Sequence, residues 1–182
     1  HDAAYTEVTY DGYVAPSVLQ VEGAMDIAME FHSLSKTANM TGWRVGMAVG
    51  NPTMIDALMR VKSNIDSGLS QANQEMGIAA LDLSTDWLNA NNEVYRKRRD
   101  KVVSVLNEIG VPTTAPKGAL YIWTPIPDGY TSAEFSEQVL EETDIFVTPG
   151  TGYGIFGEGY IRLSLTVSDD QLDVAVDRLS SW

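Results

Sequence analysis

The sequence contains no cysteine and only two histidines among its 182 residues. The absence of cysteine excludes disulfides and thiolate chemistry, and it favours a reducing cytoplasm. Basic residues are also scarce: 12 Lys and Arg stand against 25 Asp and Glu, which gives a net charge of -13. Such an acidic excess repels phosphate backbones and anionic lipid, so it argues against nucleic-acid and membrane-surface partners. We interpret the charge as a source of solubility, with adaptation to a salty milieu as the alternative.

Long apolar runs are missing as well, so neither a membrane span nor a targeting signal is predicted. An apolar content of 44% still suffices for one or two packed cores. The chain opens on His1-Asp2-Ala3, without methionine, in what reads as the end of a buried strand. We therefore expect the sequence to be the C-terminal part of a longer protein.

The first part of the chain alternates strand and helix patterns. Apolar runs of strand length occupy residues 27–33 and 44–49. Three helices are predicted after them, one starting at Pro52 behind an Asn51 cap, one at 70–83, and a long one at 85–109 closed by Gly110.

A smaller unit is predicted to follow the long helix. Strand patterns cover residues 119–124, 145–148 and 160–165, and two further helices begin at Thr131 and Ser168, with Glu134 and Gln171 three residues on. The predicted fold is thus α/β followed by a small α+β layer. We place the domain boundary so that residues 1–110 form one unit and residues 111–182 the other.

Several patterns suggest sites that the context does not support. Gly152, Gly154 and Gly157 fit the dinucleotide spacing G-x-G-x-x-G, but a strand rather than a helix follows them. The helix at 85–109 carries a basic cluster, which we interpret as a solvated helix face rather than an anion site. The members of this cluster are Arg96, Lys97, Arg98, Arg99 and Lys101.

A catalytic triad and a metal site are also not predicted. Ser33, His32 and Asp2 do not form a triad, because adjacent strand residues point to opposite faces of the sheet. Histidines and carboxylates are not clustered at metal-ligand spacing, so no metal is expected.

Lys36 is the residue whose setting indicates chemistry. It follows an apolar strand and precedes Arg44 by eight residues. Burial and a neighbouring cation both favour the neutral amine that forms a Schiff base. Arg44 and Ser33 offer the fork and hydroxyl that suit a phosphate. A reactive lysine beside phosphate ligands, with Asp2 available for a ring nitrogen and Tyr5 for a ring hydroxyl, describes a pyridoxal phosphate site.

These residues resemble the signature of the class I and II aminotransferases, the aspartate aminotransferase superfamily of fold type I. The resemblance rests on Asp2-x-x-Tyr5, Ser33-x-x-Lys36 and the stretch Thr41-Gly42-Trp43-Arg44, and it extends over the whole chain. It implies part of a mixed sheet with helices, from a large cofactor-binding domain, plus a small C-terminal α+β domain.

The resemblance also implies a role for each residue. Lys36 is expected to bind pyridoxal phosphate as a Schiff base and to move the substrate proton. Asp2 is expected to pair with the ring nitrogen and Tyr5 with the ring oxygen, while Ser33 and Arg44 hold the phosphate. Arg162, in Tyr160-Ile161-Arg162-Leu163-Ser164, is expected to clamp the substrate carboxylate.

The substrates implied are an amino acid and a 2-oxo acid. Stretches such as "EFHSLSKTANMTGWRVGMAVGN" are similar to LL-diaminopimelate aminotransferases, which implies LL-diaminopimelate and 2-oxoglutarate, in lysine biosynthesis. Aspartate, aromatic or other amino-acid aminotransferases are the alternative, together with other pyridoxal phosphate reactions such as β-elimination or decarboxylation. A non-catalytic ligand sensor and an inert fragment are the remaining alternatives.

The family resemblance further implies a cytoplasmic homodimer with its active site at the subunit interface. The polar segment 64–74, between two predicted helices, is where we expect the partner chain. The glycine loop and the stacking aromatic ring that family members place before these residues are not found in this chain. The chain by itself is therefore expected to hold only part of the cofactor pocket.

Overall fold

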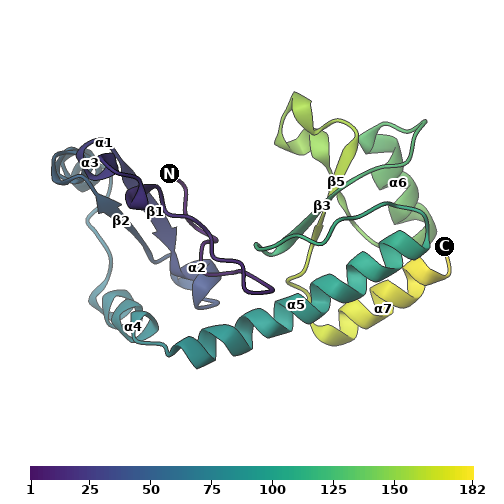
Figure 1. The fold of residues 1–182 in the computed structure, drawn as a ribbon, viewed down its shortest axis with the longest axis horizontal. Coiled ribbons are helices and arrows are strands. Elements are labelled where there is room, and N and C mark those ends of the chain that lie inside the picture. Colours follow the sequence, from purple (N-terminus) through teal and green to yellow (C-terminus); the bar gives the residue numbers. More distant parts are fainter. The chain divides into compact units, whose positions relative to one another are not determined.

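The computed structural model describes residues 1–182 and divides them into two compact units, residues 1–92 and 93–182 (Figure 1). The division falls inside helix α5 (Thr85–Glu108), whereas the sequence analysis placed a boundary after this helix. The domains 1–110 and 111–182 stay a prediction. None of the helices combines the length and the apolar character that a membrane span requires.

The first unit is built on a small mixed sheet. Strands β1 (Met29–Ser33) and β2 (Gly46–Gly50) pair antiparallel, with His32 opposite Met47. The segment at residues 1–3 runs parallel to β1, since Asp2 forms a bridge with Phe31. The sheet therefore joins three segments that lie apart in the sequence.

Both strands of this sheet are shorter than predicted, because the backbone turns before each of them. Gly23, at φ 79°, precedes helix α1 (Ala24–Ile27), so β1 starts at Met29. Arg44, at φ 54°, is left-handed and cannot continue an extended strand, so β2 starts at Gly46. The short helical turns of this unit are η1 (Val18–Gln20), α2 (Leu34–Thr37) and η2 (Thr41–Trp43).

The predicted helices of the first unit are confirmed with their caps. The Asn51 side chain accepts a hydrogen bond from the Met54 amide at the start of α3 (Pro52–Ile65). Ser70 caps α4 (Gln71–Leu81) in the same way. However, α3 buries none of its residues, and Val61 on its predicted apolar face is 61% exposed. The apolar residues of α3 are thus covered only in part within this chain: Met54, Ile55 and Leu58 are half-buried, and the end of the helix is exposed.

The second unit has a three-stranded antiparallel sheet in the order β3-β5-β4, comprising β3 (Tyr121–Pro125), β5 (Tyr160–Ser164) and β4 (Thr148–Pro149). Helices α6 (Ser132–Thr143) and α7 (Asp169–Ser180) complete it together with the end of α5. Its core is built from side chains of all these elements, among them Val105, Leu106, Ile122, Phe135, Val139, Ile161, Leu165, Leu172 and Leu179.

The helix ends in this unit follow the predicted signals. Thr131 and Glu134 form the expected capping box of α6, and the Ser168 hydroxyl accepts from the Gln171 amide at the start of α7. Gly110, at φ 84°, follows the end of α5 in the predicted left-handed conformation. The glycine-rich loop forms two short turns, η3 (Gly150–Tyr153) and η4 (Ile155–Gly157), and leads into a strand as expected.

Two predictions for the second unit are wrong in part. The strand predicted at 145–148 shrinks to β4, because the left-handed Asp144 ends α6 and the Ile145 amide bonds the Thr143 hydroxyl instead of β5. The strand predicted at 119–124 starts only at Tyr121, because Ala119 is left-handed at φ 68°.

The basic cluster of α5 is not simply a solvated face. Arg99 is only 4% exposed; it bonds Asp100 at 2.8 Å and the Pro116 carbonyl at 2.9 Å. The Arg98 guanidinium bonds Asp169 at 2.7 Å and the Leu165 carbonyl at 3.1 Å. These two arginines therefore tie the helix to the loops of the second unit through the Leu165 and Pro116 carbonyl groups.

Candidate active site

Asp2 and Ser33 share one face of the sheet in the first unit. The Ala3 amide bonds the Phe31 carbonyl at 2.8 Å, and the Phe31 amide bonds the His1 carbonyl at 2.9 Å. This parallel pairing puts Asp2 beside Phe31, and Ser33 follows two positions along the same strand. Since side chains alternate along a strand, Asp2, Phe31 and Ser33 point to the same side.

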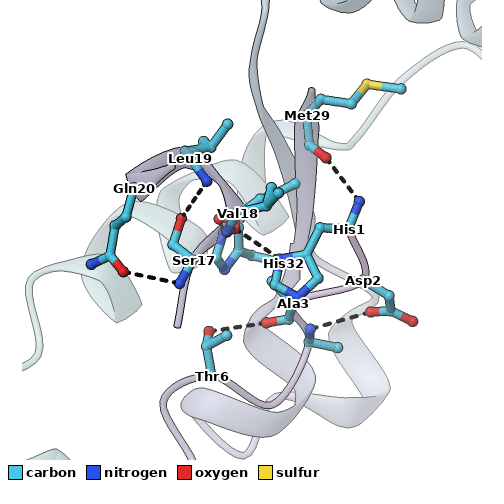
Figure 2. A network of polar contacts seen from close by, with 12 residues as sticks. His1, Asp2, Ala3, Thr6, Ser17, Val18, Leu19, Gln20, Met29 and His32 are labelled. Atoms are coloured by element: carbon cyan, nitrogen blue, oxygen red, sulfur yellow. Dashed lines mark hydrogen bonds and ion pairs between the residues drawn. The ribbon is translucent and has the colours of Figure 1, made fainter. Parts of the chain in front are cut away.

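That face of the sheet is open, and the Asp2 carboxylate on it makes few contacts. Phe31 is 40% exposed, and Asp2 is exposed as well. The Asp2 carboxylate accepts a hydrogen bond from the Ala4 amide at 3.2 Å (Figure 2). Much of its acceptor capacity thus stays available to a ligand with an N–H group.

Lys36 lies in the single turn of α2, directly after β1. The turn is anchored by its first residue, since Leu34 is buried and its amide bonds the Val45 carbonyl at 3.1 Å. The Lys36 amine lies 5.6 Å from the centre of the Tyr5 ring and makes no ion pair. Lys36 and Tyr5, both predicted as site residues, are thus brought together around an amine that no carboxylate neutralises.

Arg44 has neutral partners only. Its guanidinium donates to the Ser35 hydroxyl at 3.4 Å and to the Thr41 carbonyl at 3.2 Å. Arg44 is also one of the few non-glycine residues with a positive φ, at 54°, a strained conformation that is frequent at functional sites. The loop from Ser33 to Arg44 therefore carries two cations, and neither is paired with a carboxylate.

Ser35 belongs to this arrangement, although it was not among the predicted site residues. Arg44 donates to Ser35, which is 4% exposed, whereas Ser33 is the serine that was predicted to hold the phosphate together with Arg44. The repeated hydroxyls of Ser33-Leu34-Ser35-Lys36 were the available signal, but the choice between the two serines depends on side-chain direction. Ser35 therefore positions the guanidinium that the sequence assigned to a phosphate.

Arg162 is the site residue of the second unit. It lies in the middle of β5, opposite Trp123 of β3 and Thr148 of β4. Its guanidinium lies 4.1 Å from the centre of the Tyr121 ring and 4.2 Å from that of Tyr153. It forms no ion pair, so stacking between two rings holds the group while its N–H edge stays available for a carboxylate.

Aromatic rings surround this arginine on the surface of the second unit. Trp123 stacks on Tyr160 at 5.4 Å and meets Tyr153 edge-on at 5.8 Å between ring centres. Trp123 is 42% exposed and Phe156, in the neighbouring turn η4, is 93% exposed. The cluster combines one cation with exposed apolar rings, an arrangement that suits the carboxylate and carbon chain of a small molecule.

A cavity of about 290 Å³ lies in the first unit, and it does not contain the lysine. Its lining includes His32, Met47 and Val49, which are on the sheet face opposite to Asp2, together with the end of α4 and the start of α5. Of the predicted site residues, Ser33 also contributes to this lining. Larger hollows of about 620 and 590 Å³ lie beside α7 and contain none of the predicted site residues. The candidate site is therefore an open surface rather than the largest hollow.

The donor set fits pyridoxal phosphate as far as this chain supplies it. An amine without an ion pair, a guanidinium with neutral partners and an exposed carboxylate match the aldehyde, the phosphate and the ring nitrogen of that cofactor. No group of three or more acidic or histidine side chains is arranged for a metal ion.

Comparison with known proteins gives a consistent result. The family described as aminotransferase class I and II matches residues 1–179. LL-diaminopimelate aminotransferase of Dehalococcoides mccartyi is 57% identical over 182 residues, which is 100% of this chain and 47% of that protein. The chain thus spans about half the length of the curated relatives that it matches.

Solved structures share the fold. An aminotransferase from Staphylococcus aureus superposes with a TM-score of 0.91 at 39% identity, over 100% of this chain and 48% of that one. An aromatic aminotransferase from Pyrococcus horikoshii gives a TM-score of 0.89 at 34% identity, over 99% of this chain and 49% of that one.

Proposed function

We propose, since this chain belongs to the class I and II aminotransferase family, that its protein is a pyridoxal phosphate-dependent enzyme that moves an amino group from an amino acid to a 2-oxo acid. The observation that carries the proposal is the loop from Ser33 to Arg44. It places two cations without carboxylate partners next to the open face that bears Asp2. A structural role alone would leave these charges uncompensated.

Each residue then has a task that its geometry supports. The Lys36 amine holds the cofactor covalently and afterwards moves the proton of the substrate. Arg44, fixed by Ser35, and the Ser33 hydroxyl bind the phosphate group. Asp2 pairs with the ring nitrogen and the Tyr5 hydroxyl with the ring oxygen. The cofactor supplies the electron sink that makes the substrate α-proton removable.

Arg162 binds the carboxylate of the substrate in this proposal. A guanidinium offers two parallel N–H donors, and the two flanking tyrosines fix its plane without consuming that edge.

For the substrate, we propose LL-diaminopimelate as amino donor and 2-oxoglutarate as acceptor, in lysine biosynthesis. The support is that a curated relative named for LL-diaminopimelate is more than half identical to this chain. The structure named for aromatic substrates shares the fold at much lower identity, so aromatic or aspartate specificity is not favoured. Steady-state assays of the full-length protein with these donors would separate the alternatives, and a preference for an aromatic or aspartate donor would contradict the proposal.

The decisive experiment is reductive trapping. Borohydride treatment of the full-length protein with pyridoxal phosphate should attach the cofactor to Lys36 alone, as read by peptide mapping. The other lysines, Lys62, Lys97, Lys101 and Lys117, serve as internal controls, because exposed amines are mostly protonated at neutral pH.

Variants of Lys36 complete the test. Lys36→Ala should abolish transamination while the phosphate ligands still retain the cofactor non-covalently. Lys36→Arg should not rescue activity, because a guanidinium stays charged and does not bind the aldehyde. Trapping on another lysine, or wild-type activity of Lys36→Ala, would overturn the assignment.

A cytoplasmic homodimer is part of the same proposal. The segment 64–74 is polar and largely exposed, and it joins the end of α3 to the start of α4. A contact surface for a partner chain needs this exposure. Light scattering on the full-length protein should give twice the monomer mass. A fully active monomer would contradict this part of the proposal.

A further inference from the structure

Both histidines of the chain contact one buried carboxylate, that of Glu30. Glu30 is 2% exposed. Its Oε1 atom lies 2.8 Å from His1 Nδ1, and its Oε2 atom lies 3.1 Å from His32 Nε2. The Val18 amide donates to Oε1 at 2.6 Å. A carboxylate without exposure to water is thus surrounded by donors from three separate segments.

The ionised form of Glu30 is the one that these contacts stabilise. Burial by itself would raise the pKa of the Glu30 carboxyl, but hydrogen bonds from the Ser17 side chain, the Val18 amide and His32 lower it below its usual value. An ionised carboxylate only accepts, so both imidazoles donate to it. The ring nitrogens contact the oxygens directly, which leaves no room for a metal ion between them.

The Glu30 cluster, formed by His1, Glu30 and His32, is adjacent in sequence to two residues of the candidate site. His1 immediately precedes Asp2, and His32 immediately precedes Ser33. Along paired strands, neighbouring residues point to opposite faces. The Glu30 cluster therefore lies on one face of the sheet, and Asp2 and Ser33 lie on the other face of the same two segments.

We propose that Glu30 is a positioning residue, which clamps the segment of His1 to strand β1 from behind, with its second oxygen held by His32, and thereby fixes Asp2 in register with Ser33 for the cofactor. The proposal rests on the proposed function of Asp2 and Ser33. Main-chain bonds join the two segments at Phe31, and the His1 nitrogen also donates to the Met29 carbonyl at 3.0 Å. The His1–Glu30 contact is the side-chain cross-link between them, while His32, on the same strand as Glu30, holds the second carboxylate oxygen in place.

The test uses Glu30→Gln in the full-length protein. The amide keeps the shape of the carboxylate, but it has one acceptor oxygen in place of two, so it does not accept from both imidazoles. We expect the dissociation constant of pyridoxal phosphate to rise about tenfold, the size of effect that outer-sphere partners have at metal sites. In the protein without cofactor, amide exchange at Ala3 and Phe31 should accelerate more than global unfolding explains. The single variants His1→Asn and His32→Asn should each show part of both effects.

The matched control is Glu158→Gln in the second unit. Glu158 likewise accepts from backbone amides, at 2.7 Å from Ser132 and 3.0 Å from Gly159, but it is remote in sequence from every cofactor residue. It should lower stability and leave both readouts of the first unit unchanged. If Glu30→Gln behaves like this control, Glu30 is merely structural and the proposal is overturned.

The exchange measurement also separates the two hypotheses. If the wild type binds no pyridoxal phosphate, the proposed function fails, yet faster exchange at Ala3 and Phe31 in Glu30→Gln would still support the clamp. Unchanged exchange at both amides would overturn the clamp whatever the cofactor does. If Glu30→Gln does not fold, the two histidine variants decide by the same readouts.

Discussion

At the scale of single residues, the buried charges are the most informative. Glu30 and Arg99 are both almost inaccessible to water, yet each is provided with hydrogen bonds that offset its desolvation. Each therefore gives a measurable prediction.

Glu30 should contribute to stability in a pH-dependent way. Its folded-state pKa lies below the ordinary value of 4.5, so the unfolded chain takes up the proton more readily than the folded one. The contribution is present above that value and is lost as the pH falls through the lowered folded pKa. His1 and His32 are the titratable groups facing it.

The expected result is that Glu30→Gln is less stable than wild type at pH 7 and that the difference shrinks below about pH 4. Urea denaturation at several pH values measures both curves. Because other carboxyls also have lowered pKa values, only the difference between the curves reports on Glu30. A gap that widens in acid would contradict the assignment.

Arg99 should be important for the second unit. Arg99→Met keeps the volume but leaves the Pro116 carbonyl without its Arg99 donor and Asp100 with only its bond from Arg96, so we expect a loss of about 2 kcal/mol in unfolding free energy. Lys97→Met on the same helix is the control: its side chain is 67% exposed and its ammonium lies 3.8 Å from Glu93, and an exposed pair of this kind contributes little. Equal losses in urea denaturation would refute the distinction.

At the scale of elements, the tightest point is the loop between β4 and β5. A Cβ on Gly150 would lie 2.0 Å from the Gly157 carbonyl oxygen, whereas one on Gly152 would meet nothing closer than 3.7 Å. We expect Gly150→Ala to cost about 2 kcal/mol or more, because backbone must move, and Gly152→Ala to be nearly neutral. Thermal unfolding of the two variants checks this pair, and a neutral Gly150→Ala would show that the loop yields easily.

Helix ends could be predicted from the sequence, and strand starts could not. Ser70, Thr131 and Ser168 cap helices through bonds to residues three positions away, which local sequence shows. The left-handed backbone of Arg44 and Ala119, which delays two strands, is set by surrounding structure, and neither residue type signals it.

The candidate site also has one part that the sequence predicted and another part that it did not. The order and spacing of Asp2, Ser33, Lys36 and Arg44 pointed to a cofactor. The bond from Arg44 to Ser35 and the clamp around Glu30 depend on which side chains face each other across paired segments. A glutamate two positions before a histidine within an apolar strand was the one visible sign of that clamp.

At the scale of the whole molecule, we expect the net charge of -13 to determine how stability responds to salt. Moderate salt should raise the melting temperature, because screening weakens the repulsion among carboxylates. Salt also weakens ion pairs, but those such as Lys62–Asp66 and Lys101–Asp173 are exposed and contribute little. A melting temperature that falls steadily with sodium chloride would show that these pairs outweigh the repulsion.

The exposed apolar side chains of α3 lead to a second prediction for the whole molecule. Helix α3 buries nothing, and Ile65 at its end is 76% exposed. Surfaces of this kind are usually covered by other protein. We expect the isolated chain 1–182 to self-associate as its concentration rises, which sedimentation would detect; a monomer at all concentrations would contradict this.

The clamp around Glu30 carries an expectation about evolution. One carboxylate serves two imidazoles, so a replacement at position 30 would leave both rings without an acceptor, and a replacement of one ring would leave a buried charge less well compensated. Positions 1, 30 and 32 should therefore change together among homologues. Lineages that lose the glutamate should have lost the histidines as well, while Asp2 and Ser33 on the other face of the sheet persist.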